Sequence, residues 1–198
     1  MNKYNNIRVT NLLGGIDSMT ERSKSIFYTE MDSPIGSLII ASTDSGICWL
    51  GFGKNEDALF ALTRWTKRWL STDKLERSDD KLNSAVQQLT EYFNGTRKNF
   101  ELSVDLYGTT FQKLVWDSLL SIPYGEVRTY KDIAIHINAP KAVRAIGGAN
   151  HNNPVSIIVP CHRVIGSNGN LVGYGGGLDI KQYLLELEGY LDKVKKIL

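Results

Sequence analysis

The sequence predicts an α/β (α+β) N-terminal domain with a small antiparallel sheet, followed by a mostly helical C-terminal domain of the winged helix-turn-helix type. Residues 25–50 consist of short apolar segments with turn residues between them, a pattern typical of strands. From Thr109 onward the apolar residues recur at helical spacing, in short segments that proline and glycine separate. We therefore expect an N-terminal lead at 1–24, an α/β domain at 25–105, a helical domain with the candidate functional residues at 106–192, and a tail at 193–198.

Composition and charge describe an ordinary globular chain. It has 198 residues, of which 42% are hydrophobic and 22% charged, enough for one sizeable core or two small ones. The formal net charge is +2, so attraction to nucleic acid has to come from a local patch. The N-terminus lacks the apolar core of a signal peptide, and no stretch approaches the roughly 20 apolar residues of a membrane span. We expect a cytoplasmic protein with reduced thiols and no membrane partner.

Each expected element of the first domain has its own signal. Ser-Pro and Asp-Ser-Gly turns separate three apolar segments, which predicts a three-stranded antiparallel meander. Helical spacing over 56–70 and 80–93 predicts two helices, the second of which is closed by Asn94-Gly95. The lead is polar and has no period, and Met19 within it offers an alternative start.

The second domain has the outline of a helix-turn-helix. Apolar residues at helical spacing predict a helix over 109–122. Thr129 stands three residues ahead of Asp132, the capping-box arrangement that opens a helix. This helix should end near Asn138, which tolerates the left-handed conformation of a tight turn. Pro140 then sits where the first turn of the next helix tolerates proline.

The helix after Pro140 has one basic and small face. Counted at about 100° per residue from Val143, the side chains of Lys141, Arg144 and Gly148 point away from its apolar side. An ordinary solvated helix also meets this pattern. Glycine inside a helix, however, costs up to about 1 kcal/mol relative to alanine, and Gly147 precedes a second glycine here. Close approach to another backbone, such as a phosphate chain or a groove floor, would explain that cost.

Cys161 follows a short apolar segment, which predicts a buried strand over 155–159 that Pro160 ends. A lone cysteine in such a place is commonly a small buried hydrophobe. Zinc is disfavoured because the histidines and cysteines show no ligand-pair spacing. A tight turn with unpaired N–H groups and a following arginine would favour a thiolate. Neighbouring residues do not face each other on a helix, so His162 would take the thiol proton through a water. Packing and nucleophilic roles both remain open from these residues alone.

A histidine base needs a third group that orients it. On the helix predicted near 178–189, Glu188 borders the apolar stripe, whereas Glu186 faces away. Glu188 is therefore the carboxylate better placed to be partly buried. A salt-bridged or solvated glutamate ahead of the Gly189 cap is the alternative interpretation.

Three stretches of this chain resemble one family, the O6-alkylguanine-DNA alkyltransferases. They are "TTFQKLVWDSLLSIPYGEVRTYKDIA" at 109–134, "PKAVRAIGGAN" at 140–150 and "NPVSIIVPCHRVIGSNGNLVGYGGGLDIKQYLLELEG" at 153–189. The Pro-Cys-His-Arg-Val block is the most specific part, and "SPIGSL" resembles the family's N-terminal domain more loosely.

The resemblance implies a role for each matching residue. Cys161 would accept the alkyl group, with His162 and Glu188 as a water-linked relay, while Tyr130 would push the target phosphate and hydrogen-bond the extruded base. Arg144 matches the finger that replaces the flipped nucleotide, on a helix that would lie in the minor groove. Further DNA contacts would come from Lys131, Lys141, Gly148 and Ser167. The hinge and base pocket would involve Asn153, Tyr174 and Gly175.

The resemblance also implies the activity. We expect stoichiometric, irreversible transfer of an alkyl group from O6-alkylguanine in double-stranded DNA to Cys161, which could extend to O4-alkylthymine. No cofactor and no structural metal are expected, and the protein should act as a monomer. A non-catalytic alkyl-lesion sensor and a Cys-His-Glu hydrolase are the alternatives.

Overall fold

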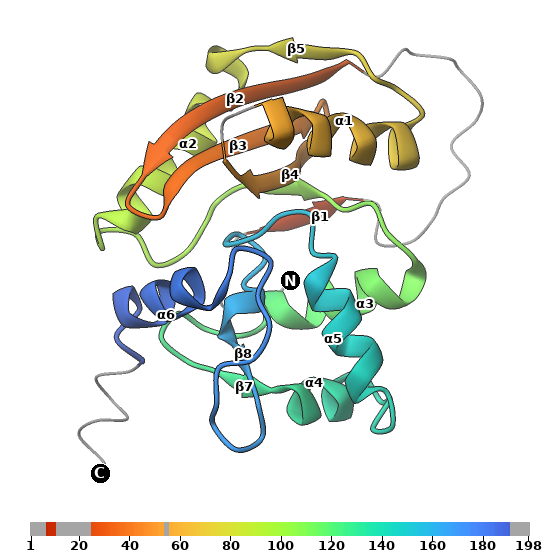
Figure 1. The fold of residues 1–198 in the computed structure, drawn as a ribbon, viewed down its shortest axis with the longest axis vertical. Helices are drawn as coiled ribbons and strands as arrows, with labels where there is room; N and C mark the ends of the chain where they lie inside the picture. Colours follow the sequence, from red (N-terminus) through yellow and green to blue (C-terminus); the bar gives the residue numbers. More distant parts are fainter. Residues whose placement is uncertain (1–6, 11–24, 54–55, 191–198) are drawn as a thin grey trace.

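The chain folds into a sheet with two helices, drawn above, and a group of shorter helices, drawn below, in Figure 1. The structure is a computed structural model that describes residues 7–10, 25–53 and 56–190. Met19 and the predicted tail lie outside the described residues. The helices are α1 (Glu56–Leu70), α2 (Asp79–Phe93), α3 (Thr110–Leu120), α4 (Tyr130–His136), α5 (Val143–His151), the short 3-10 helix η1 (Cys161–Arg163) and α6 (Leu178–Leu187).

The sheet of the first half is mixed, and it is larger than the predicted antiparallel meander. Its strand order is β1-β6-β4-β3-β2-β5. The meander β2-β3-β4 is present and antiparallel, but β5 joins β2 in parallel, and β6 joins both β4 and β1 in parallel. The strands are β1 (Arg8–Thr10), β2 (Ile26–Ser33), β3 (Gly36–Thr43), β4 (Gly46–Phe52), β5 (Leu75–Arg77) and β6 (Ser103–Asp105).

The three strands that sequence analysis missed are the shortest of this sheet. Strands β1, β5 and β6 have 3 residues each, too few to show the alternation by which a strand is recognised. Strand β1 also lies in the lead, for which no regular structure was expected. These strands form through pairing with distant segments and not through a local pattern. Strand β1, for example, pairs with β6, which follows it by about 95 residues.

Alternation along β3 divides the sheet into two faces. Ile39 and Ala41 pack with α1 on one face. Leu38 and Ile40 face the other side and share a core with α2 and with the helices of the second half. One continuous apolar core therefore joins the two halves of the molecule.

The second half contains the predicted helix-turn-helix. Both helices α3 and α4 begin with capping boxes, formed by Thr109 with Gln112 and by Thr129 with Asp132, the second as predicted. Asn138 in the following turn has φ 56°, the expected left-handed conformation. Helix α5 begins only at Val143, so Pro140 precedes its first turn and does not lie in it. Two short strands, β7 (Arg128–Thr129) and β8 (Val164–Ile165), pair in parallel beside these helices.

The segment before Cys161 is buried, but it is not the predicted strand. Residues 155–159 form a turn with isolated bridges, and Ile157 has φ 73°. The N–H of Leu50 donates to the carbonyl of Pro154 at 2.7 Å, and Leu50 pairs with Val155. The segment that leads to Cys161 is thus anchored on β4 of the sheet, which the apolar run alone did not indicate.

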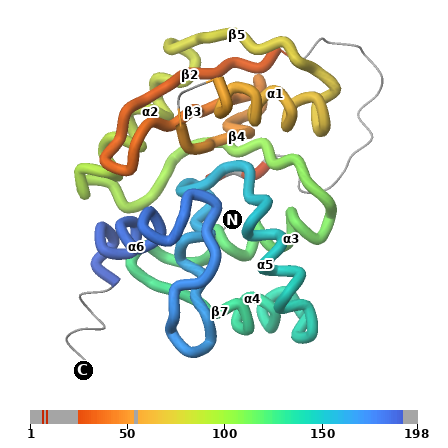
Figure 2. Tube along the Cα trace, in the orientation of Figure 1, coloured from red at the N-terminus to blue at the C-terminus, as the bar shows by residue number. Residues whose placement is uncertain are grey.

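Two further findings concern membrane-spanning helices and the cysteines. No helix in the described part of the chain is long and apolar enough to cross a membrane. Cys48 and Cys161 are both buried and free, as expected for reduced thiols. Figure 2 shows the loop between β8 and α6 reaching down toward the level of α4.

Candidate active site

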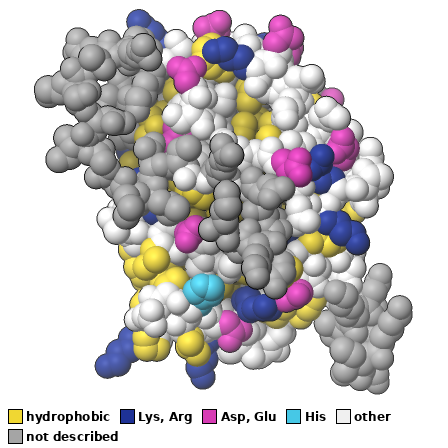
Figure 3. Space-filling model, turned by 180° about the vertical axis from the view of Figure 1, so that it is seen from behind, with side chains coloured by type: hydrophobic (Ala, Val, Ile, Leu, Met, Phe, Trp, Pro, Cys, Tyr) yellow, Lys and Arg dark blue, Asp and Glu magenta, His cyan; other side chains and the backbone are white. Residues whose placement is uncertain are grey.

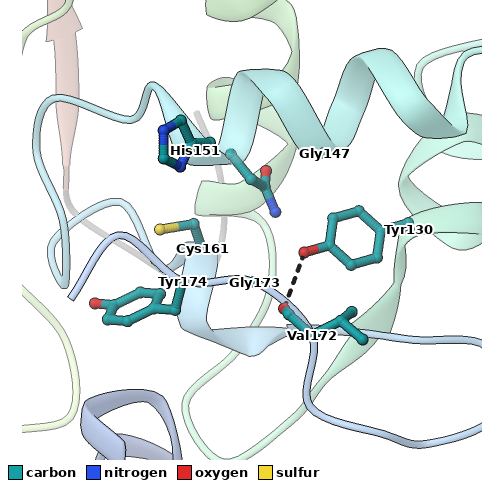
Figure 4. Close-up of a pocket in the computed structure, with 8 residues that line it drawn as sticks. Tyr130, Gly147, His151, Cys161, Val172, Gly173 and Tyr174 are labelled. Atoms are coloured by element: carbon teal, nitrogen blue, oxygen red, sulfur yellow. Dashed lines mark hydrogen bonds between the residues drawn. The ribbon is translucent and has the colours of Figure 1, made fainter. Parts of the chain in front are cut away.

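Cys161 lies against a cavity of about 220 Å³ between the helix-turn-helix and the loop that follows β8. The side chain is 4% exposed, at the first position of η1. Figure 4 shows His151 at the end of α5 above this sulfur, Tyr174 below it and Tyr130 to its right. The lining residues are Tyr130, Gly147, Asn150, His151, Cys161, Val172, Gly173 and Tyr174. We call this cavity the thiol pocket.

Asn153, the predicted hinge, holds the thiol in place. Its amide nitrogen donates to the Sγ of Cys161 at 3.1 Å and to the carbonyl of Val159 at 2.8 Å. Its amide oxygen accepts the N–H of Val155 at 3.1 Å. Burial raises the pKa of the Cys161 thiol, while the Asn153 hydrogen bond and the charge of Lys181 partly offset this. The group therefore rests as a thiol with donors already aimed at the thiolate it can become.

Glu188 is the centre of the buried polar network behind the thiol. Its Oε1 accepts from Tyr92 at 2.7 Å, from Nε2 of His162 at 2.9 Å and from Arg163 at 2.8 Å. Its Oε2 accepts from the N–H of Gly125 at 3.0 Å and from Nε of Arg163 at 2.9 Å. Burial opposes the charge, but His162 and Arg163 outweigh it and hold the pKa of Glu188 well below its ordinary value. The carboxylate predicted to be partly buried is in fact fully buried and ionised.

The network sets the tautomer of His162. Burial lowers the pKa of this imidazole, so it is neutral at rest. An ionised Glu188 can only accept, so Nε2 must carry the hydrogen and Nδ1 must present a lone pair. Nδ1 is buried and has no hydrogen-bond partner among the described residues. Because no direct hydrogen bond joins it to Cys161, proton transfer through an intervening water fits this geometry.

Lys181 is a site residue that sequence analysis missed. Its ammonium group is buried and donates to the carbonyls of Val164 at 2.6 Å, Val172 at 2.8 Å and Gly173 at 3.4 Å. Burial lowers the pKa of Lys181 to about 8, and Cys161 opposes that shift. Its charge fixes the loop that closes the thiol pocket and favours a thiolate at Cys161.

Helical spacing could have revealed Lys181, but no sequence signal marks Arg163 and Tyr92, two further site residues that were missed. Lys181 precedes the buried Leu184 by three positions and Glu188 by seven, so all three share one face of α6. Arg163 and Tyr92 have no local pattern that marks them, because each becomes a partner of Glu188 only through the fold.

The polar side chains of the thiol pocket differ in whether they have partners. The Tyr130 hydroxyl donates to the carbonyl of Val172 at 3.3 Å, and burial raises its pKa, which the nearby Asn150 partly offsets. The amide nitrogen and oxygen of Asn150 are buried without a hydrogen-bond partner among the described residues. The Tyr174 hydroxyl is also unpaired there, but it points away from Cys161 and Tyr130 (Figure 4). Such groups are costly to leave unsatisfied, so the pocket is built to receive a polar ligand. Asn150 was not predicted, although it follows Ile146 by four positions on α5.

The residues predicted to contact DNA lie on the surface. Figure 3 shows Lys and Arg side chains at the lower end of the molecule, where Figure 1 places α4. A Cβ on Gly147 or Gly148 would meet nothing within 4 Å outside its own helix, so packing within the protein does not require glycine at either position. Gly175 is exposed and does not line the thiol pocket, and Val143, placed on the apolar side, is 39% exposed. The predicted contact residues Lys131, Lys141, Arg144, Gly148 and Ser167 are all exposed.

Fold and site together define a protein that carries a buried, network-supported cysteine beside a helix-turn-helix. Two family models match the chain: "6-O-methylguanine DNA methyltransferase, ribonuclease-like domain" over residues 26–106 and "6-O-methylguanine DNA methyltransferase, DNA binding domain" over 110–190. The chain therefore belongs to the 6-O-methylguanine DNA methyltransferase family, also called the O6-alkylguanine-DNA alkyltransferases.

Similar proteins agree with this assignment along most of their length. The methylated-DNA–protein-cysteine methyltransferase of Methanosarcina acetivorans is 44% identical over 164 residues, which cover 83% of this chain and 99% of the relative. The inducible enzyme of that name from Bacillus subtilis is 46% identical over 149 residues, covering 75% and 82%. The crystal structure of Mycobacterium tuberculosis OGT in complex with DNA superposes with a TM-score of 0.70 at 43% identity, covering 83% and 92%.

Proposed function

We propose that this protein repairs alkylated DNA by direct reversal, transferring a methyl or alkyl group from O6-alkylguanine irreversibly to Cys161. The observation that carries the proposal is the thiol pocket, in which a buried cysteine backed by His162 and Glu188 opens beside a helix-turn-helix. Family membership and relatives named methylated-DNA–protein-cysteine methyltransferases support it.

Access to the alkyl carbon requires extrusion of the base. That carbon lies inside the stack of double-stranded DNA, and flipping the nucleotide out costs a few kcal/mol. The smooth face at Gly147 and Gly148 allows close approach to the groove, and Arg144 would fill the gap in the stack. Lys131, Lys141 and Ser167 would hold the flanking backbone. The extruded base would then enter between Tyr130 and Tyr174, within reach of Cys161.

The transfer is an in-line displacement at carbon. His162 accepts the Cys161 proton through a water, and the Glu188 carboxylate, which Arg163 holds in place, stabilises the imidazolium that forms. The thiolate forms the new S–C bond as the C–O bond breaks, and the electron pair of that bond stays on the guanine oxygen. Tyr130 keeps its proton because its pKa is raised, so it can donate a hydrogen bond to the departing base. The thioether product has no easy hydrolytic exit, so each molecule acts once.

Intact-protein mass spectrometry tests the proposal. The protein is mixed with a short duplex that contains one O6-methylguanine, alongside a Cys161→Ser sample. We expect a gain of one methyl group that saturates at one per protein and is absent from the variant. Binding without a mass gain would favour a lesion sensor, and repeated product release without a protein adduct would favour a hydrolase. Either result contradicts the proposal.

We further propose that the protein acts as a cytoplasmic monomer on one lesion at a time. One thiol pocket and one helix-turn-helix lie in the same chain, so no second copy is needed to complete the site. Light scattering of the free protein and of its complex with one lesion duplex would measure the stoichiometry. A stable dimer in both states would overturn this part.

A further inference from the structure

A second cavity of about 270 Å³ lies between α1 and the start of α3, away from the thiol pocket. It shares no lining residue with the thiol pocket. Its walls combine Arg64 and Arg68 with Trp65, Trp69 and Tyr107. We call it the α1 pocket, and nothing in the repair reaction uses it.

The aromatic walls of the α1 pocket are held in place by the fold. Trp65 packs edge-to-face on Tyr107 with ring centroids 5.9 Å apart, and the Tyr107 hydroxyl donates to Asp105 at 2.8 Å. Trp116 is 1% exposed, and its indole N–H donates to the carbonyl of Ala149 at 2.9 Å. Rigid rings of this kind need little ordering when a ligand binds.

The cations of the α1 pocket have no carboxylate partner in the described part of the chain. Arg64 and Arg68 are exposed one turn apart on α1, where like charges repel each other. The guanidinium of Arg68 lies 5.2 Å from the ring centre of Trp69. Lys67 on the same turn, in contrast, pairs with Asp73 at 3.1 Å. The helix dipole favours a cation such as Arg68 in the last turn of α1, but it does not account for Trp65 and Trp69, each of which directly follows one of the two arginines.

We propose that the α1 pocket binds a nucleotide unit of single-stranded DNA. Guanidinium groups attract the phosphate, and indole faces stack on a base whatever its identity, the combination typical of single-strand binding. An acidic peptide would use the arginines but would leave the aromatic walls without a partner. The choice of DNA rests on the proposed function. It is supported by position, because Asn152 lines this pocket and directly follows His151, which lines the thiol pocket.

Indole resonances offer a direct test, because the chain contains only four tryptophans. A 5′-phosphorylated deoxydinucleotide, too short to span the helix-turn-helix surface, is titrated into ¹⁵N-labelled protein. The indole N–H signals of Trp65 and Trp69 should shift in a saturable way, and that of Trp49 on β4 should move less. Shifts confined to residues of the thiol pocket, or no shift at all, would overturn the proposal.

Matched charge variants separate a binding site from general attraction. Arg64→Gln with Arg68→Gln should weaken dinucleotide binding about tenfold, because both phosphate contacts are lost. Lys67→Gln with Lys74→Gln removes the same charge from exposed positions that do not line the pocket, and should weaken binding less than twofold. Equal losses in the two pairs would contradict the proposal.

Methyl transfer to Cys161 distinguishes this proposal from the proposed function. The Arg64 and Arg68 variants should accept one methyl group from a lesion duplex, which shows that they fold. If the wild-type protein bound the dinucleotide at Trp65 but gained no methyl group, the repair function would fail while the α1 pocket stood. If it gained the methyl group without any dinucleotide binding, only the α1 pocket would fail.

Discussion

Burial shifts the pKa of each titratable side chain around Cys161. It raises the pKa of the Cys161 thiol and lowers the pKa values of His162 and Lys181. Glu188 and Lys181 keep their charges against burial. His162 and Arg163 surround the Glu188 carboxylate, and three backbone carbonyls accept hydrogen bonds from the Lys181 ammonium. The site therefore rests with a neutral thiol and imidazole, and it forms the reactive thiolate when a substrate is in place.

Lys181 should give the transfer rate an unusual pH dependence. The thiolate is favoured by rising pH, but the Lys181 ammonium that stabilises it is lost above its pKa of about 8. The rate should rise with pH and then level off or fall above about pH 8. Below about pH 8, the rate of Lys181→Met should be about tenfold lower than that of the wild type, a difference of ~1.4 kcal/mol. The upper inflection should disappear in this variant. Single-turnover rates across the pH range measure both effects, and an unchanged upper inflection would contradict the role.

Asn150 should help the pocket to distinguish guanine from thymine lesions. Its unpaired amide offers a donor and an acceptor. O6-methylguanine presents ring nitrogens that accept and an amine that donates, whereas O4-methylthymine presents only acceptors on its pairing edge. Asn150→Leu should therefore slow transfer from O6-methylguanine about tenfold, which corresponds to roughly 1–1.5 kcal/mol. It should slow transfer from O4-methylthymine less. Parallel single-turnover assays test this, and equal losses would exclude the role.

At the scale of elements, local signals predicted helices better than strands. Helix α1 has the predicted bounds, α2 begins one residue earlier than predicted, and the capping box at Thr129 is confirmed. Each depends on contacts a few residues apart, which a sequence displays directly. The parallel strands β5 and β6 depend on distant partners. The supposed strand over 155–159 is a buried turn, because an apolar run reports burial and not conformation.

The turn between α4 and α5 tests how far the backbone of Asn138 controls the helix-turn-helix. With φ 56°, a residue with a Cβ and no polar side chain is strained there by roughly 1–2 kcal/mol. Asn138→Ala should lower the free energy of unfolding by about 1 kcal/mol, while Asn138→Gly, which adopts this conformation freely, should be nearly neutral. Urea unfolding compares the two variants. A loss of similar size in both would point to the Asn138 side chain instead of the backbone.

At the scale of the whole molecule, the catalytic network is assembled from both halves. Glu188 at the end of α6 is bonded to Tyr92 of α2, to Gly125 after α3 and to Arg163 of η1. The sequence indicated Glu188 and His162, since helical spacing and adjacency mark them. Tyr92 is separated from Glu188 by 96 positions, and only the shared core that joins the sheet to the second half brings them together.

Removing the charge of Glu188 should therefore destabilise the whole fold. Glu188→Gln leaves Arg163 buried without a counter-charge, a change that costs about 3–5 kcal/mol. The pKa of Glu188 is depressed in the folded state, so its contribution is present above the ordinary value of 4.5 and is lost as the pH falls below it. The stability gap between wild type and variant should accordingly be large at neutral pH and shrink on acidification.

Urea midpoints measured as a function of pH test this expectation, with Glu186→Gln as the matched control. Glu186 lies two residues earlier on the same helix and is exposed. Within the described part of the chain, the one hydrogen bond that its side chain accepts comes from Gln182, at 3.0 Å. Its loss should change stability by less than about 0.5 kcal/mol. A similar cost for both variants would mean that helix α6 itself, and not the buried Glu188 network, couples the site to the fold. A cost confined to Glu188→Gln would show that the carboxylate orienting His162 also holds the two halves together.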